Sequence, residues 1–239
     1  MTPPTAAPSD LSAGSFSLLH HEIEQNGFGL VRNVMNAGEC LTLLEILGSV
    51  SGAGNRGLLG RPEVTALAHS DRLLNLIRPH LPAEPQPVRA IYFDKSAEAN
   101  WGVPWHQDLT IALRARAEAA GFGPWSTKEG IPHVQPPAEL LARMLTLRLH
   151  LDNTDESNGS LRVLPGSHRQ GRLTSARIQE LRAQQPDFLC AAATGDALLM
   201  RPLLLHASGR STSPRHRRIL HLEYAGFTLP EGLEWHEAA

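Results

Sequence analysis

The spacing of hydrophobic residues changes near residue 88, and this change divides the predicted secondary structure into two parts. Before it, apolar residues recur every three or four positions, as on the buried face of a helix. Helices are predicted over residues 16–25, 37–50 and 71–77, with a short strand over residues 28–32. Glycines at positions 27, 52 and 54 follow the first two helices and are expected to end them.

Apolar and polar residues alternate in several segments after residue 88. The clearest segment is 145–152, where four leucines alternate with four polar residues, as in a strand with one apolar face. Asn158 and Gly159 form a predicted turn. Further strands are predicted over residues 88–93, 109–113, 161–164, 197–200, 203–207 and 218–224. Helices followed by many short strands indicate a mainly β fold, a β-sandwich or barrel with helices flanking one outer face.

Composition fits one folded domain and narrows the class of function. The chain has 239 residues, of which 41% are hydrophobic and 19% charged, and its net charge is −2. A domain of this size buries enough surface to fold without disulfides. The charge balance does not indicate the basic surface that nucleic-acid binding requires. Residues 1–15, rich in Pro, Ala, Thr and Ser, are expected to be a flexible arm before a single domain over residues 16–239.

Cysteine usage and hydropathy predict where the protein works. Cys40 and Cys190 lie far apart in the sequence and form no pair of the metal-binding type. Such sparse usage is typical of a reducing compartment. The N-terminal segment lacks the pattern of a secretory signal, and no apolar run approaches the length of a membrane span. We therefore expect a soluble cytoplasmic protein without a membrane or nucleic-acid partner.

The motif Trp105-His106-Gln107-Asp108 carries the first candidate chemistry. His106 and Asp108 are two residues apart, so in an extended strand both side chains point to one face. An imidazole and a carboxylate side by side can bind a first-row metal ion, and a second histidine would complete a facial triad. The pattern His-x-Asp is common, however, and does not by itself establish a metal site.

His206 is the preferred third ligand among the twelve histidines of the chain. It follows three leucines in the predicted strand 203–207, and a polar ring there must face a cavity, a hydrogen-bond partner or a metal ion. A buried histidine satisfied by a hydrogen bond is the alternative. His150 and His221 remain as other candidates for the third ligand.

Arg217, eleven residues after His206, is the candidate anion-binding residue. If a new strand begins at residue 218, the guanidinium can return to the same pocket and form a two-pronged contact with a carboxylate. Ser208 lies two residues beyond His206 and can donate a hydroxyl hydrogen bond to that carboxylate. Arg215 and Arg218 lie close enough in the sequence to take the same role.

These residues, together with the run Asn158–His168 (NGSLRVLPGSH), resemble the phytanoyl-CoA dioxygenase family. The resemblance covers residues 88–224. It implies a double-stranded β-helix, the jelly-roll or cupin-like fold. It also implies a non-haem oxygenase in which His106, Asp108 and His206 hold Fe(II), with 2-oxoglutarate and O2 as co-substrates and a small molecule as the substrate.

The resemblance also assigns roles to other residues. Arg217 and Ser208 would hold the distal carboxylate of 2-oxoglutarate. Lys95 lies near where the family often has a basic or polar pocket residue, although a lysine is otherwise expected on the surface. Relatives that halogenate have a small residue in place of the carboxylate ligand. Because this chain has Asp108, the resemblance favours hydroxylation, with release of succinate and CO2.

Residues 114–137 are expected to form a lid over the substrate. The segment is rich in glycine and proline, and long irregular segments in compact domains usually carry function. It directly follows the strand predicted next to the His106/Asp108 pair. Trp125, Lys128 and His133, with Arg148 on a neighbouring strand, would then contact the substrate, and their charges suggest that it is anionic. Alternatively, the loop covers the outer sheet and Trp125 belongs to the core.

Two other functions remain open. A zinc hydrolase could use the same three ligands, but Arg217 and Ser208 would then lack a partner and no glutamate stands out as a general base. A jelly roll that binds small molecules without catalysis is the second alternative, because a fold does not determine a function. The sequence predicts neither the substrate nor the oligomeric state.

Overall fold

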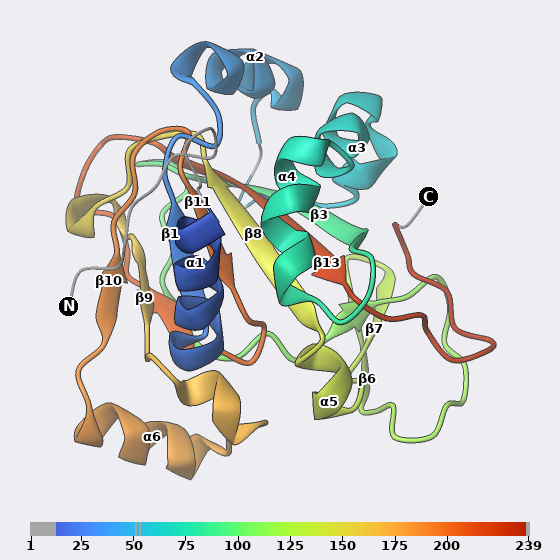
Figure 1. The fold of residues 1–239 in the computed structure, drawn as a ribbon. Coiled ribbons are helices and arrows are strands. Elements are labelled where there is room, and N and C mark those ends of the chain that lie inside the picture. The colour runs from blue at the N-terminus through green and yellow to red at the C-terminus, as the bar shows by residue number, and fades with distance from the viewer. Residues whose placement is uncertain (1–12, 51, 53, 238–239) are drawn as a thin grey trace.

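The computed structural model describes residues 13–50, 52 and 54–237, and antiparallel β-sheets form its centre (Figure 1). The larger sheet contains, in spatial order, β1 (Phe28–Val31), β11 (Ala197–Met200), β8 (Met144–His150), β13 (Arg217–Ala225), β3 (Gln86–Lys95) and β2 (Gly54–Asn55). A smaller sheet contains β10 (Phe188–Cys190), β9 (Leu161–Val163), β12 (His206–Ser208) and β4 (Val103–His106). A third sheet contains β5 (Ile111–Ala112), β7 (Ile131–Val134) and β6 (Trp125–Lys128).

Helices cover the outer face of the larger sheet (Figure 1). They are α1 (Ala13–Asn26), α2 (Ala37–Leu47), α3 (Pro62–Ala68) and α4 (Asp71–Ile77). Their apolar side chains form one buried cluster with alternate residues of β3, β8, β11 and β13. Burial of this apolar area is the main favourable contribution to folding. Outside this layer, α5 (Ala138–Leu141) follows the third sheet, and α6 (Ser175–Gln184) packs near the smaller sheet.

The two faces of β8 have different environments. Leu145, Leu147 and Leu149 belong to the cluster under the helices, as the alternating pattern predicts. Every residue of the strand is buried, however, so the polar face does not point to solvent. Arg148 and His150 point instead toward the interior between the sheets, because successive side chains of a strand point to opposite faces. The larger sheet therefore has an apolar outer face and a polar inner face.

The predicted helix ends are mostly close to those observed. Helix α1 begins at Ala13, within the segment predicted as an arm, and residues 1–12 of that segment lie outside the described residues. Helix α2 ends at Gly48, before the predicted glycines, and Asn36 caps its start through a reciprocal hydrogen bond with Glu39. The helices α3 and α6 were not predicted, since each is short or has a weak apolar face.

The strand predicted over residues 203–207 is wrong, and the reason lies in where its leucines pack. Leu203, Leu204 and Leu205 join three different apolar clusters. A strand has only two faces, so consecutive residues cannot reach three clusters while extended. The chain turns there instead, with the amide of Leu204 donating to the carbonyl of Arg201 at 3.0 Å. The strand β12 begins only at His206.

The segment 114–137 is not wholly irregular, because it contains the hairpin β6–β7. Glu129 and Gly130 connect the two strands, both with positive φ (52° and 81°), as in the two-residue turns that favour hairpins. A glutamate in the first position hid this turn from the sequence analysis. The neighbouring strand predicted over residues 109–113 is also shorter than expected and spans only Ile111–Ala112.

Two further observations concern the environment of the protein. None of the helices among the described residues is both long and apolar enough to span a membrane. Cys40 and Cys190 are buried free thiols. The cytoplasmic location stays a prediction.

Candidate metal centre and its cavity

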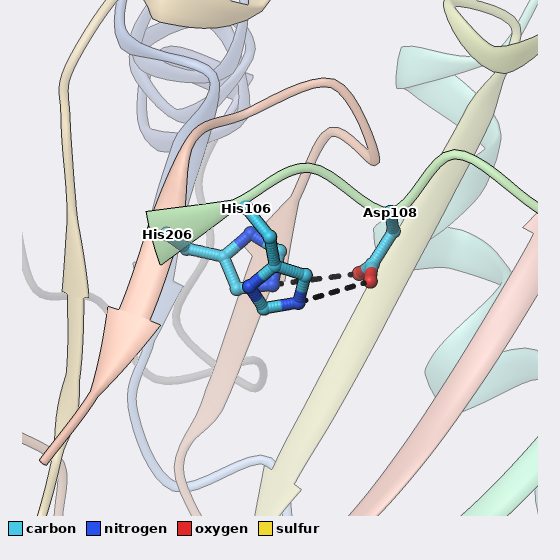
Figure 2. A group of neighbouring side chains, drawn as sticks. All are labelled: His106, Asp108 and His206. Carbon is cyan, nitrogen blue, oxygen red and sulfur yellow. Dashed lines mark ion pairs between the residues drawn. The ribbon is translucent and has the colours of Figure 1, made fainter. Parts of the chain in front are cut away.

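His106, Asp108 and His206 converge at the ends of two paired strands (Figure 2). His106 ends β4 and His206 begins β12, and the two residues lie opposite each other in the antiparallel pair. Their ring centroids are 4.2 Å apart. The carboxylate of Asp108 points toward both rings, with an oxygen 3.6 Å from Nε2 of each histidine.

The donor atoms of the three residues fit a single metal ion. All lie within 4.8 Å of one another. Two donors that each lie about 2.1 Å from one ion are at most about 4.2 Å apart, and the 3.6 Å separations between nitrogen and oxygen fall within that limit. Only small side-chain adjustments are needed to close the group around an ion. Three ligands on one side leave other coordination positions free for co-substrates.

Hydrogen bonds hold both histidines in the tautomer that binds a metal. Nδ1 of His106 lies 2.9 Å from the carbonyl oxygen of Pro104, and Nδ1 of His206 lies 2.8 Å from that of Leu204. A carbonyl oxygen only accepts, so Nδ1 carries the proton in each ring. Nε2 therefore presents its lone pair to the space beside Asp108.

The charges of the three residues also suit a metal ion. Burial alone would raise the pKa of Asp108, but His206 and His106 hold it below its ordinary value. Burial lowers the pKa of His206 to about 4, although Asp108 opposes this. Burial also lowers the pKa of His106, but Asp108 and the backbone hydrogen bonds to Pro104 and His206 together raise it above its ordinary value. At neutral pH the site therefore offers an ionised carboxylate and a neutral His206.

Asp108 reaches the site from a loop rather than from a strand. It lies two residues beyond the end of β4, so the predicted alternation within one strand does not position it. Its backbone amide donates to the carbonyl of Pro202 at 2.9 Å. The adjacent Gln107 is buried, and its side-chain amide donates to the carbonyls of Gly171 and Leu203. This anchoring role of Gln107 was not predicted, and the one feature of the sequence that indicates it is the position of Gln107 between two candidate ligands.

The triad opens into a cavity of about 230 Å³ between the two larger sheets. Of the residues predicted for binding, Ser208, Arg217, Lys128 and Arg148 line this cavity. The cavity is lined by Arg56, Arg89, Ile91, Phe93, Trp101, Val103, His106, Asp108, Thr110, Lys128, Arg148, Leu161, His206, Ser208, Arg217, His221 and Glu223.

The two other candidate ligands lie apart from the triad. His150 is outside this lining, and its Nδ1 lies 2.8 Å from the hydroxyl oxygen of Thr154. His221 lines the cavity but faces Arg148, whose Nη1 is 2.9 Å from its Nδ1. The group of described residues that could hold a metal ion is the predicted triad.

Two buried cationic groups lie side by side at one end of the cavity; Arg217 lines it, whereas Lys95 lies behind Ser208 and outside the lining. Arg217 (4% exposed) and Lys95 (0% exposed) lie opposite each other in the pair β13–β3. Nη1 of Arg217 donates to the carbonyl of Gly159 at 2.5 Å, and its Nε is buried without a partner among the described residues. Nζ of Lys95 donates to the carbonyl of Gly209 at 2.6 Å and lies 3.4 Å from Oγ of Ser208.

Burial shifts the titration of both groups. It lowers the pKa of Lys95 to about 7, and the charges of Arg217 and Arg148 contribute. It lowers the pKa of Arg217 to about 9, so Arg217 stays charged at neutral pH. The alternative of a surface position for Lys95 is wrong, because the strand β3 directs its side chain inward, where Nζ lies 5.2 Å from the ring centroid of Trp101.

The other two arginines near Arg217 face elsewhere. Arg215 is exposed and pairs with Asp155, with Nη2 2.7 Å from Oδ2. Arg218 pairs with Asp152, with Nη2 2.6 Å from Oδ1. Of the three arginines, Arg217 is the one that lines the cavity.

The structure brings only part of the predicted substrate set to the cavity. Lys128 lines it, with Nζ 3.1 Å from Oγ1 of Thr110. Trp125 lies opposite Val134 in the hairpin and packs against the apolar cluster that contains it. His133 is fully buried outside the lining, with its Nδ1 2.9 Å from the carbonyl of Ile131. Neither Trp125 nor His133 is therefore placed to contact a ligand in this cavity.

Several cavity residues were missed by the sequence analysis. Arg89 and Glu223 face each other across β3 and β13, with Nη1 3.2 Å from Oε1. Phe93 and Ile91 lie on the same inner face of β3 as Arg89. Alternation along β3 carried a signal for this face, since residues 88, 90 and 92 belong to the apolar clusters instead.

Two histidines and one carboxylate, open to a cavity inside antiparallel sheets, are the ligand set typical of mononuclear non-haem iron oxygenases. The family model described as Phytanoyl-CoA dioxygenase (PhyH) matches residues 23–219. The chain belongs to this family, a family of Fe(II)- and 2-oxoglutarate-dependent oxygenases. Among curated proteins, no sequence matches the chain significantly.

Solved structures share the fold at low sequence identity. EctD from S. alaskensis with bound Fe aligns with a TM-score of 0.69 at 18% identity, over 97% of this chain and 84% of its own. The epimerase SnoN in complex with Fe3+, alpha ketoglutarate and nogalamycin RO aligns with a TM-score of 0.67 at 16% identity, over 90% and 84%. HygX from Streptomyces hygroscopicus gives 0.65 at 17%, over 92% and 89%. The predicted jelly roll is confirmed.

We predict that His206→Ala abolishes stoichiometric Fe(II) binding while the protein stays folded. One of three ligands is lost, and water cannot replace the imidazole that Leu204 orients. Metal content after anaerobic loading measures the effect, with circular dichroism as a check on folding. His216→Ala is the matched control, because this exposed histidine pairs with Asp94 away from the triad. Full iron content in the His206 variant would contradict the assignment.

Proposed function

We propose that the chain is an Fe(II)- and 2-oxoglutarate-dependent dioxygenase that hydroxylates a small organic substrate and releases succinate and CO2. The observation that carries the proposal is the position of Arg217. This buried guanidinium, whose Nε has no hydrogen-bond partner in the described part of the chain, lines the same cavity as the triad. 2-Oxoglutarate requires a set of iron ligands with a carboxylate-binding side chain nearby.

Different residues in and beside the cavity would bind iron and 2-oxoglutarate. His106, Asp108 and His206 would hold iron. Arg217 would bind the distal carboxylate of 2-oxoglutarate in two-pronged fashion, with Ser208 and Lys95 donating to the same group. Iron and 2-oxoglutarate, once bound, supply the oxidising power for O2 chemistry. The protein orients the co-substrate and excludes water.

The electrostatics of the buried end favour an anionic co-substrate. Arg217 and Lys95 are adjacent cations in a site with little solvent, and such a pair is costly unless an anion neutralises it. A carboxylate between them would satisfy the unpartnered Nε of Arg217 and offset the repulsion. A zinc hydrolase gives no reason for this pair.

The carboxylates in the cavity also disfavour the hydrolase. Of the described residues that line it, only Asp108 and Glu223 are acidic, and Glu223 is paired with Arg89. A metal-bound water would therefore lack a free carboxylate as general base. Hydroxylation is the outcome that Asp108 favours, although solved structures with this fold include a described epimerase and a described carbocyclase.

The direct test measures succinate formed from 2-oxoglutarate. We expect succinate only when Fe(II) and O2 are both present, and none from the His206→Ala protein. A small-metabolite extract supplied under 18O2 should then yield a product with one labelled oxygen atom. A transformed metabolite without the label would show that the protein catalyses an oxidation other than hydroxylation. Hydrolysis supported by Zn(II), without succinate, would establish the hydrolase.

We predict that Arg217→Lys weakens 2-oxoglutarate binding by about thirtyfold, because loss of one charge-assisted hydrogen bond costs about 2 kcal/mol. Calorimetric titration of the anaerobic Fe(II) protein measures this affinity. Arg215→Lys is the matched control, since Arg215 is exposed and pairs with Asp155, and its affinity should equal that of the parent. An unchanged affinity in Arg217→Lys would move the carboxylate anchor to another residue.

We predict that the affinity for 2-oxoglutarate falls as pH rises above about 7. The pKa of Lys95 is lowered to about 7, so its ammonium is present below that pH and is lost above it. Because a carboxylate binds the charged form, affinity is highest below this pKa and declines above it by up to about tenfold per pH unit. The nearby charges of Arg217 and Arg148 contribute to the lowered pKa of Lys95, and its Nζ lies 3.4 Å from Oγ of Ser208.

Lys95→Met is the variant that isolates this effect. Methionine fills a similar buried volume without a titrating group. The dissociation constant for 2-oxoglutarate is measured at pH 6.5, 7.5 and 8.5. For the variant it should be larger than for the parent at pH 6.5 and nearly constant across the three pH values. The histidine ligands titrate alike in both proteins, so they cancel in the comparison. Parallel slopes for the two proteins would contradict a role for Lys95.

A further inference from the structure

A second set of cationic side chains lines the cavity away from Arg217. Arg56, Arg89, Lys128 and Arg148 all face this part of the cavity. On the inner face of the larger sheet, Arg148 lies opposite His221 and Arg89 lies opposite Glu223. His221 lies four positions beyond Arg217 on β13, about 13 Å along the strand. The cavity therefore has a second cationic end, whose Arg148 lies close enough to the first for its charge to lower the pKa of Arg217.

The charges at this second end do not cancel within the protein. Arg89 pairs with Glu223, and Arg56 pairs with Glu129 on the hairpin turn. Among the described residues, Arg148 and Lys128 have no carboxylate in ion-pair contact. The remaining cavity carboxylate, Asp108, is directed at the two histidines. Two cationic groups thus remain for a ligand, in addition to those assigned to 2-oxoglutarate.

Arg148 has the geometry of an unfilled carboxylate site. It is only 8% exposed, and its Nη1 lies 2.9 Å from Nδ1 of His221. Its Nε is buried without a hydrogen-bond partner among the described residues. The edge formed by Nε and Nη2 is the edge that matches the two oxygens of a carboxylate. A buried, unsatisfied donor of this kind is costly, and a ligand would remove the cost.

Apolar side chains lie next to these cations. The guanidinium carbon of Arg148 is 5.9 Å from the ring centroid of Phe93, and Ile91 lines the same wall. Lys128 reaches the cavity from the hairpin β6–β7, and its Nζ donates a hydrogen bond to the hydroxyl oxygen of Thr110. A bound molecule would thus meet cationic groups at one point and apolar surface beside it. The small volume of the cavity, about 230 Å³, restricts the size of that molecule.

We propose that the substrate is a small carboxylic acid whose carboxylate is bound by Arg148 and Lys128, with its apolar body against Phe93 and Ile91. This inference rests on the proposed function, because it assumes that 2-oxoglutarate occupies the end at Arg217. The guanidinium of Arg148, with its unpartnered Nε among the described residues, and the ammonium of Lys128 would together offset the charge of one small anion. The acid would lie beside the triad, since Arg148 and Lys128 line the same cavity as His106, Asp108 and His206.

The test uses matched pairs of probes that differ only in charge. The anaerobic Fe(II) protein is first titrated with 2-oxoglutarate and then, at saturation, with benzoate and benzamide, 3-phenylpropionate and 3-phenylpropionamide, and hexanoate and hexanamide. Calorimetry and thermal shift report binding without turnover. Saturation with 2-oxoglutarate prevents the acids from occupying the end at Arg217. We expect at least one acid to bind about tenfold or more tightly than its amide.

Variants connect this preference to the named residues. Arg148→Gln should remove the preference for acids while the affinity for 2-oxoglutarate changes by less than about threefold. Lys128→Gln should reduce the preference severalfold, and it serves as the second variant because Lys128 is exposed and its loss does not threaten folding. Arg177→Gln, on the surface of α6, is the control and should bind every probe as the parent does.

The outcomes separate this proposal from the proposed function. A parent protein that binds no 2-oxoglutarate would overturn the proposed function, and this inference with it. Normal 2-oxoglutarate binding without any preference for acids would overturn only the inference. Loss of 2-oxoglutarate binding in Arg148→Gln would assign Arg148 to the co-substrate and also overturn it. If Arg148→Gln does not fold, an unchanged preference in Lys128→Gln has the same meaning.

Discussion

The antiparallel pairing of β4 with β12 is the contact on which the site depends. It places His106 opposite His206, one hundred residues apart in the sequence, so that their rings approach to 4.2 Å. Backbone carbonyls of Pro104 on β4 and of Leu204 just before β12 fix the tautomers, and the loop anchored by Gln107 brings Asp108 to the pair. Because backbone hydrogen bonds set these positions, the donor atoms are arranged before any metal ion binds.

The two faces of the larger sheet differ in chemical character. Its outer face supplies leucines to the apolar cluster under the helices. Its inner face holds charged residues, including Lys95, Arg148 and Arg217, with little exposure to solvent. Buried charges without counter-ions reduce stability. Ligands that neutralise them would stabilise the folded protein, so we expect binding of 2-oxoglutarate to raise thermal stability as well as to prepare the site.

The hairpin β6–β7 shows how one local structure serves both packing and the cavity. Trp125 faces the apolar cluster, whereas Lys128, three residues later, faces the cavity. The same hairpin carries Glu129, which pairs with the cavity residue Arg56. The segment is therefore partly a β-hairpin rather than wholly irregular, and its role as a lid over the substrate stays a prediction. The connection between β5 and β6 is a long loop, as the sequence predicted.

The sequence by itself predicted the mainly β architecture, which is confirmed, and the candidate metal ligands, because alternation along segment 145–152 and the motifs around His106 and His206 are local patterns. It also identified Arg217, through spacing and family resemblance. Only the tertiary structure decided that Lys95 is buried, that the leucines before His206 turn into three clusters, and that Arg148 faces a cavity. These properties depend on which strands pair and which faces meet, and such contacts join residues too distant in the chain for periodicity to record.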